Sequence, residues 1–288
     1  MVDLLLDPFA FQFMRNGLYA GLLTVVSASL VGTWVVMRGM SFMGDAMAHG
    51  VLPGIAVAFL LGGNLLVGAA ISAAVMIAGV SLASARSRLG DDVAIGLLFV
   101  GMLALGVAII SARGAYAGDL TTILFGDPIG VTAGNLRTLL LATAATIVIT
   151  AALYRPFLVL SFSRAKALVL GMHPRSAHLA MLGLIAMVIV TSFRTVGTLL
   201  VFAFLVAPPA TASLIARRVP VMMVVSVMVG AVSVLSGLLI SFYFGTATAA
   251  TIAGLSVLLY FAVLTVREVV DGLRRWTVGR ERQAAAPA

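Results

Sequence analysis

The sequence MSFMGDAMAHGVLPGIAVA, residues 40–58, places an aspartate and a histidine inside a run of residues that otherwise suits a lipid bilayer. On an α-helix, Asp45 and His49 are four residues apart and therefore share one face, with Cβ atoms about 6 Å apart. That separation suits two ligands of one metal ion. An ionisable side chain at the centre of a membrane helix costs about 2.5–3.5 kcal/mol, so such residues usually line a polar pathway. The stretch predicts a membrane-spanning helix with a functional site in it.

The composition of the whole chain agrees with a membrane protein. Apolar residues make up 62% of the sequence and charged residues 10%, and the mean hydropathy is +1.17. These values predict an all-α, polytopic helical membrane protein. The apolar runs are continuous and about 20 residues long, which argues against a β-barrel, whose strands alternate. There is no cysteine, so a disulfide framework and a thiolate metal site are both excluded.

The apolar runs divide the chain into membrane spans. Nine are predicted, with eight as the main alternative, at residues 16–37, 42–62, 65–85, 94–111, 136–153, 179–192, 196–216, 221–244 and 249–266. Residues 1–15 are too short to cross and are interrupted by a proline, so an interfacial helix is expected there. The whole chain, residues 1–288, is expected to form one transmembrane domain.

Two consecutive prolines, Pro208 and Pro209, interrupt the seventh span. Neither has a backbone N–H, so the helix is expected to kink or unwind there. A gate or hinge at this position and a simple packing kink are equal alternatives.

The distribution of arginine and lysine predicts the orientation. With the C-terminus in the cytoplasm, 14 of the 18 basic residues fall on the cytoplasmic side, as the positive-inside rule requires. The basic loop at 154–178 and the basic tail at 267–288 are then both cytoplasmic. The rule accounts for most of the net charge of +8, so the charge does not call for nucleic acid as a partner. The tail has the charge to contact anionic lipid.

Several kinds of catalytic chemistry are absent from the sequence. The single lysine, Lys166, does not follow a glycine-rich loop, so the chain has no phosphate-binding loop and cannot hydrolyse ATP by that route. Neither a Ser-His-Asp arrangement nor an H-E-x-x-H motif is present. What remains is a transport subunit that is not itself an enzyme. An ion-coupled secondary transporter and a non-transporting scaffold are the rival classes.

Four segments resemble the membrane permeases of bacterial ABC importers for zinc and manganese, the ABC-3 family. They are WVVMRGMSFMGDAMAHGVLPGIAVAFLL at 34–61, GDDVAIGLLFVGMLALGV at 90–107, DLTTILFGDPIGVT at 119–132 and VGTLLVFAFLVAPPATASLIARR at 196–218. The resemblance implies the ABC importer permease fold and a homodimer in the bacterial inner membrane. It also implies two partners: a cytoplasmic ATPase, which uses the ATP, and an extracytoplasmic metal-binding protein.

The resemblance also assigns roles to residues. It implies that Asp45 and His49 coordinate the metal during translocation, and that the segment 162–171, with Arg164, Lys166 and Gly171, is the coupling helix that docks the ATPase. The segment departs from the family pattern in lacking acidic residues. No cofactor is expected to be bound permanently, because the metal is the substrate.

Two copies of the pair, facing each other across a dimer axis, would supply two oxygen and two nitrogen ligands, enough for a four-coordinate Zn²⁺. Zinc is the first expectation because affinity favours it, with manganese and iron as alternatives. The imidazole of His49 must be neutral to bind, so uptake is expected to fall at acid pH. The plain alternative is that Asp45 caps its helix and His49 donates to a backbone carbonyl.

Overall fold

The computed structural model describes residues 7–86, 91–111, 126 and 130–284. Within these ranges the chain is helical almost throughout and contains no β-strand. The helices are η1 (Asp7–Ala10), α2 (Gln12–Met37), α3 (Ser41–Gly50), α4 (Leu52–Leu60), α5 (Leu65–Arg86), α6 (Asp91–Ser111), α8 (Ala133–Ala152), α9 (Tyr154–Phe162), α10 (Arg164–Val169), α11 (Pro174–Val196), α12 (Thr198–Ile215), α13 (Val219–Phe244) and α14 (Thr248–Ala284). The prediction of an all-α protein is confirmed.

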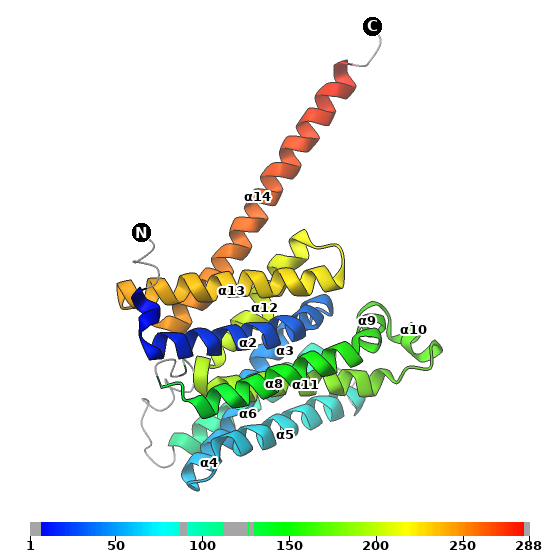
Figure 1. The fold of residues 1–288 in the computed structure, drawn as a ribbon. Helices are drawn as coiled ribbons and strands as arrows, with labels where there is room; N and C mark the ends of the chain where they lie inside the picture. The colour runs from blue at the N-terminus through cyan, green and yellow to red at the C-terminus, as the bar shows by residue number, and fades with distance from the viewer. Residues whose placement is uncertain (1–6, 87–90, 112–125, 127–129, 285–288) are drawn as a thin grey trace.

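Nine helical segments of the described chain are long and apolar enough to cross a membrane. Eight of them lie within single helices, and the ninth combines α3 and α4 as Ser41–Leu60. The number agrees with the nine spans predicted from the apolar runs rather than with eight. Figure 1 shows a bundle of roughly parallel helices, from which the C-terminal half of α14 extends away.

The boundaries of two spans differ from the prediction. The sixth span, α11, begins at Pro174 rather than at residue 179, so the expected loop at 154–178 ends at residue 173 and contains the helices α9 and α10. The fixed φ angle of proline suits the first position of a helix, where its missing N–H costs nothing. The first span begins at Gln12, and a single 3-10 turn precedes it where an interfacial helix was expected. Residues 1–6 of that segment lie outside the described ranges.

The tail expected at 267–288 continues α14 as far as Ala284, and residues 285–288 lie outside the described ranges.

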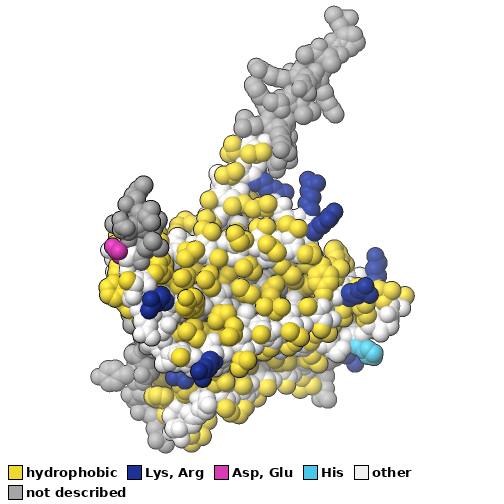
Figure 2. Space-filling view, in the orientation of Figure 1, with side chains coloured by type: hydrophobic (Ala, Val, Ile, Leu, Met, Phe, Trp, Pro, Cys, Tyr) yellow, Lys and Arg dark blue, Asp and Glu magenta, His cyan; other side chains and the backbone are white. Residues whose placement is uncertain are grey.

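The two ends of the bundle differ in charge. The helices α9 and α10 and the turn between α12 and α13 lie at one end, on the right of Figure 1, while η1 and the turn between α13 and α14 lie at the other. Figure 2 shows a broad hydrophobic band between these ends, with most of the visible lysine and arginine at the right-hand end.

The centre of the bundle consists of α2, α3, α11 and α12, whereas α5, α6, α8 and α14 lie at the periphery, and α4 packs against α5 and α6. Trp34 on α2 is fully buried and packs edge-on against Tyr154 and Phe157 of α9. Small residues allow the closest helix contacts. A Cβ atom on Gly54 of α4 would overlap the backbone oxygen of Gly68 on α5, and a Cβ atom on Gly68 would overlap that of Gly54. This close approach of two backbones is typical of membrane helices.

Candidate metal site

Asp45 and His49 lie on α3 with their side chains directed at the same space. The Nε2 atom of His49 is 3.6 Å from the Oδ1 atom of Asp45. This distance is too long for a hydrogen bond. It is close to the separation of about 3.3 Å between two ligand atoms of a tetrahedral metal ion with bonds of about 2.0–2.1 Å. The distance would suit two neighbouring ligands of one ion, and it does not fit a hydrogen-bonded pair.

The pair lies on the accessible face of α3. The side chains of His49 and Asp45 are 25% and 30% exposed, and Phe42 is exposed on the same face. The residues on the opposite face, such as Met43 and Met47, are fully buried. The pair thus faces outward from the protomer at a depth of about 6–12 Å along α3 from its first residue.

The plain alternative for the pair does not fit the structure. The N-cap of α3 is Met40, and Asp45 is the fifth residue of the helix, so Asp45 does not cap it. The Nδ1 atom of His49 is buried and has no hydrogen-bond partner among the described residues, so the expected bond to a backbone carbonyl is not formed. The interpretation of Asp45 and His49 as a helix cap and a structural donor is wrong.

A break in the second span, which was predicted as one unbroken helix, follows directly after His49. The helix α3 ends at Gly50, and α4 begins at Leu52 with Pro53 in its first turn. Because Pro53 has no N–H, it cannot bond to the carbonyl of His49 as a continuous helix would require. The hydroxyl of Ser72 on α5 donates to the carbonyl oxygen of Gly50 at 2.8 Å. The proline in the stretch 40–58 was the available signal for this break.

The imidazole of His49 is held by an aromatic side chain from another helix. Phe99 of α6 lies edge-on to the His49 ring, with centroids 5.5 Å apart, and it also contacts Phe42 at 5.6 Å. A metal-binding histidine usually has its second nitrogen hydrogen-bonded, and here the ring contact orients it instead. Phe99 lies in an apolar run with no pattern that distinguishes it, so this contact with His49 could not be predicted from the sequence.

One protomer supplies only two ligands. Among the described residues, no group of three or more His, Cys, Asp or Glu side chains could hold a metal ion. Within the described part of the chain, Asp45 and His49 thus have no third His, Cys, Asp or Glu side chain beside them.

The two prolines of α12 lie inside a continuous helix. Pro208 and Pro209 are buried, and α12 is helical from Thr198 to Ile215, so the expected unwinding is wrong. The carbonyl of Leu205 has no N–H to accept from Pro209, and Gly32 of α2 lies directly against that oxygen. Neighbouring helices can compensate for such freed backbone groups. A hinge or gate at these prolines stays a prediction.

The helix α12 also supports α3. A Cβ atom on Gly44 would lie 3.3 Å from the Phe202 ring and 3.5 Å from a Leu205 methyl group. Gly44 is the residue before Asp45, so side chains of α12 pack immediately beside the pair. The helix α12 is therefore in contact with the helix that carries Asp45 and His49.

The predicted coupling segment forms the short helix α10. The hydroxyl of Ser163 accepts a bond from the backbone N–H of Lys166 at its start, as an N-cap does. At its end, Gly171 has a φ angle of 69°, and the N–H of Met172 bonds to the carbonyl of Ala167. This pattern is a Schellman motif, in which glycine supplies the left-handed conformation. The sequence therefore defines both ends of a helix of only six residues, whose first residue is Arg164.

The helix α10 and the residues beside it expose several apolar side chains. Val169 is 88% exposed, and Phe162, Leu168 and Leu170 are also exposed. An exposed cluster of this kind commonly marks a protein interaction surface. Lys166 is exposed beside it.

A polar contact joins the end of α2 to the helix α11. Arg38, at the end of α2, donates to the Nδ1 atom of His178 on α11 at 3.0 Å and to the sulfur of Met181 at 3.7 Å. Because a guanidinium group only donates, the His178 nitrogen accepts. Arg38 lies three residues before α3, and α11 follows α10, so the contact links the segment just before α3 to the helix that follows α10.

A model of the ABC 3 transport family matches residues 10–267. The chain belongs to this family. The resemblance found in the sequence is thereby confirmed, and the chain is a multi-pass membrane protein, the permease subunit of an ABC importer of metal ions.

Relatives and a solved structure agree with this assignment. The manganese transport system membrane protein MntC of Halalkalibacterium halodurans is 32% identical over 84% of this chain and 83% of its own length. The chelated iron transport system membrane protein YfeD of Yersinia pestis is 33% identical over 93% of this chain and 90% of its own length. The structure of PsaBC from Streptococcus pneumoniae in complex with Fab matches with a TM-score of 0.82 and 30% identity, over 91% of this chain and 95% of that chain. The predicted permease fold is confirmed.

Proposed function

We propose that this permease carries Mn²⁺ into the cell, with Fe²⁺ as the next candidate, and that Asp45 and His49 bind the ion on its way. The observation that carries the proposal is the geometry of this pair, with ligand atoms 3.6 Å apart on the accessible face of a membrane-spanning helix. Carboxylate and imidazole together suit both ions. The names of the relatives, which are manganese and iron transport proteins, support the same choice.

The pair requires a second protomer. A partly exposed carboxylate and imidazole at membrane depth would face lipid in an isolated chain, which is unfavourable. A two-fold axis beside α3 would cover both side chains and bring four ligands together. We therefore propose a homodimer in which each copy contributes half of the site.

The partners follow from the two ends of the bundle. The exposed apolar surface of α10, with Lys166 beside it, is the proposed docking site of a separate cytoplasmic ATPase. The end that carries most of the arginine is then cytoplasmic, as is the C-terminus, in the bacterial inner membrane. A metal-binding protein would deliver the ion to the opposite end.

Zinc was the first expectation from the ligand set alone, and it stays a prediction. The affinity order that favours zinc applies to any nitrogen and oxygen site, so it says little about the ion that is transported. Selectivity in a carrier also depends on delivery by the binding protein. The relatives therefore shift the proposal to manganese and iron without excluding zinc as a competitor.

Uptake by the reconstituted complex tests the function. The permease and its ATPase would be placed in vesicles, and uptake of labelled Mn²⁺ would be measured with and without ATP. We expect ATP-dependent uptake that unlabelled Mn²⁺ and Fe²⁺ inhibit, with Zn²⁺ as the third competitor. Uptake driven by an ion gradient without ATP would support a secondary transporter instead. Inhibition by Zn²⁺ alone would restore the zinc expectation.

The end of α10 gives a second test, directed at the ATPase. Replacement of Gly171 by alanine should weaken ATPase binding by about 5- to 30-fold, because a left-handed conformation costs an alanine about 1–2 kcal/mol. The new Cβ atom would meet no other atom within 4 Å, so the effect comes from the backbone alone. Binding of the purified ATPase to the detergent-solubilised permease measures it.

Asparagine at position 171 is the matched control. It tolerates the left-handed conformation far better than alanine, so Gly171→Asn should keep most of the binding. Equal binding by the glycine, asparagine and alanine proteins would show that α10 is not the docking site.

A further inference from the structure

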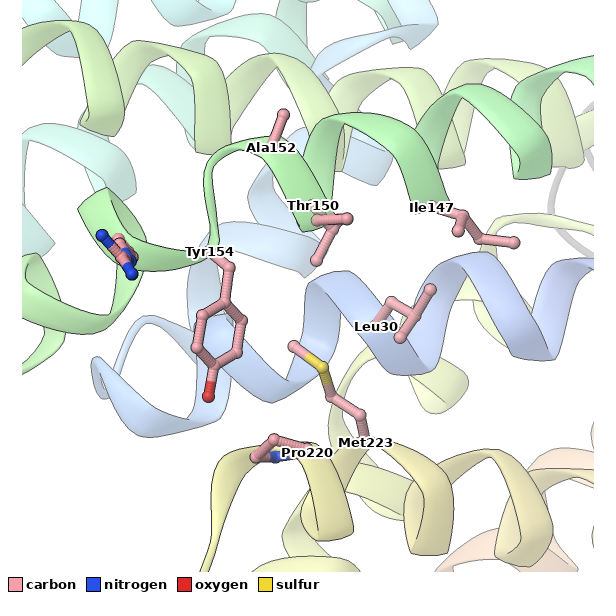
Figure 3. Close-up of a pocket in the computed structure, with 9 residues that line it drawn as sticks. Leu30, Ile147, Thr150, Ala152, Tyr154, Pro220 and Met223 are labelled. Carbon is pink, nitrogen blue, oxygen red and sulfur yellow. The ribbon is translucent and has the colours of Figure 1, made fainter.

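A pocket of about 570 Å³ opens on the side of the bundle, away from Asp45 and His49. Its lining comes from α2, α13 and the junction of α8 with α9. Figure 3 shows Leu30, Ile147 and Met223 from three different helices around it, with Thr150 and Tyr154 beside them. The volume is in the range of ordinary ligand pockets.

The pocket runs from the membrane boundary into the hydrocarbon layer. Tyr154 and Arg155 are the first two residues of α9, at the end of the bundle that carries most of the arginine. Ile147 lies about 8 Å along α8 from the end of that helix at Ala152, and Leu30 lies about 10 Å along α2 from its end at Met37. Val148 and Val224, which lie on the outside of α8 and α13, are 66% and 64% exposed. Lipid rather than water therefore surrounds the apolar part of the pocket.

Three side chains that can donate hydrogen bonds line this pocket and have no hydrogen-bond partner within the described part of the chain. The hydroxyl of Thr150 is buried, with the residue 4% exposed, and has no partner among the described residues. Tyr154 and Arg155 also form no hydrogen bond or ion pair within the described part of the chain. A buried donor without a partner is costly, so a ligand with acceptor oxygens would be stabilised here.

We propose that this pocket binds one anionic phospholipid. The phosphate would lie between Arg155 and the hydroxyl of Tyr154, and an acyl chain would extend past Leu30, Ile147 and Met223. Thr150 lines the pocket, and its hydroxyl without a partner would donate to an ester oxygen of the lipid. Basic pockets between membrane helices on the cytoplasmic side are typical sites for such headgroups.

Two further features favour a lipid over a soluble ligand. Arg217 and Arg218 are exposed and lie three and two residues before Pro220, which also lines the pocket, so two further positive charges are close to it along the chain. Tyr154 packs against the buried Trp34 of α2 at 5.5 Å between ring centroids. A bound lipid would therefore hold together α2, which leads to the metal-site helix, and α9, which leads to α10. Placing this lipid in the cytoplasmic leaflet depends on the proposed orientation, but the pocket itself does not.

Binding of defined lipids to the purified full-length permease tests the proposal. The probes are phosphatidylglycerol and phosphatidylcholine, added to the delipidated protein and counted by native mass spectrometry. We expect one phosphatidylglycerol to bind at least about fivefold more tightly than phosphatidylcholine, and Arg155→Gln to remove that preference. Arg137→Gln is the matched control, because Arg137 is an exposed arginine in the first turn of α8 at the opposite end of the bundle.

Thr150→Val separates the pocket from general surface charge. Valine keeps the shape of threonine and removes the hydroxyl, so both lipids should bind more weakly while the unfolding temperature without lipid does not fall.

A phosphatidylglycerol preference that survives in Arg155→Gln would overturn the proposal and point to another basic region, such as the tail. Equal binding of the two lipids by the native protein would also overturn it. If Arg155→Gln does not fold, Tyr154→Phe and Arg155→Lys decide: the first should weaken binding, and the second should retain it. None of these outcomes depends on metal uptake, so a failure here leaves the proposed transport function intact.

Discussion

Replacement of His49 by alanine should abolish metal uptake by the assembled transporter. In a homodimer the substitution removes two of the four proposed ligands at once. Loss of a partner in the outer shell of a metal site already costs about 10- to 100-fold, so the initial uptake rate should fall by more than about 100-fold. Asp45→Asn should have an effect of similar size. The measurement is ATP-dependent uptake of labelled Mn²⁺ into vesicles that contain the permease and its ATPase.

The double substitution of Asp45 and His49 sharpens this experiment. If both side chains hold one ion, either change alone destroys the site, and the double variant should be no worse than the single ones. If the two side chains acted independently, the reductions in uptake of the two single variants would instead multiply in the double variant. Glu268→Gln is the matched carboxylate control, because Glu268 is exposed on α14 and lies outside the site. Undiminished uptake by His49→Ala would remove the assignment.

The same variants should fold normally. Both side chains are partly exposed, and His49 forms no hydrogen bond among the described residues, so their removal leaves no buried group without a partner. Taking an ionisable group out of a membrane span lowers its insertion cost. Unfolding temperatures at or above that of the native protein are therefore expected, and they would show that the loss of uptake is a loss of ligands.

The sequence predicted the fold and the pair because both depend on short-range patterns. Continuous apolar runs and the distribution of arginine define the membrane spans one at a time, and the four-residue spacing of Asp45 and His49 defines a shared helix face. The support of the pair could not be predicted in this way. Phe99 reaches the His49 ring from another helix, and Ser72 bonds to the Gly50 carbonyl from a third. Contacts between helices have no periodic signature in a single sequence.

The effect of a proline on its helix could not be predicted from the neighbouring sequence, either at Pro53 or at Pro208 and Pro209. Pro53 was a visible signal, yet its span was predicted as one unbroken helix, although α3 ends just before it. Pro208 and Pro209 were expected to kink or unwind their helix, and α12 continues through them without unwinding. The outcome depends on the neighbours, since Ser72 accommodates the first break and Gly32 packs against the backbone freed by the second. A proline removes a hydrogen bond, and tertiary packing decides what replaces it.

The contact between Gly32 and α12 leads to the second large effect. A Cβ atom at position 32 would overlap the carbonyl oxygen of Leu205 and lie 2.9 Å from the Cγ atom of Pro209. Both atoms belong to rigid groups, so the helices α2 and α12 would have to move apart. Gly32→Ala should therefore destabilise the protein by about 3 kcal/mol and lower its unfolding temperature by about 5 °C or more.

Gly183→Ala is the matched control for this change. Gly183 lies inside α11, and a Cβ atom there would meet no other atom within 4 Å. Because alanine favours helix by up to about 1 kcal/mol over glycine, the control should keep or raise the unfolding temperature. Unfolding temperatures that agree for the two alanine variants would contradict the close contact between α2 and α12.

Removal of the Pro209 ring then shows whether the Leu205 carbonyl oxygen or the Pro209 Cγ atom causes the destabilisation. In the double variant Gly32→Ala with Pro209→Ala, the contact with Cγ disappears, and the new N–H can bond to the Leu205 carbonyl as in an ordinary helix. The overlap with that carbonyl remains, so we expect only partial recovery of the unfolding temperature. Full recovery would identify the ring as the sole obstacle. Since Leu205 also packs on Gly44 beside Asp45, even the folded fraction of Gly32→Ala should carry metal more slowly than the native protein.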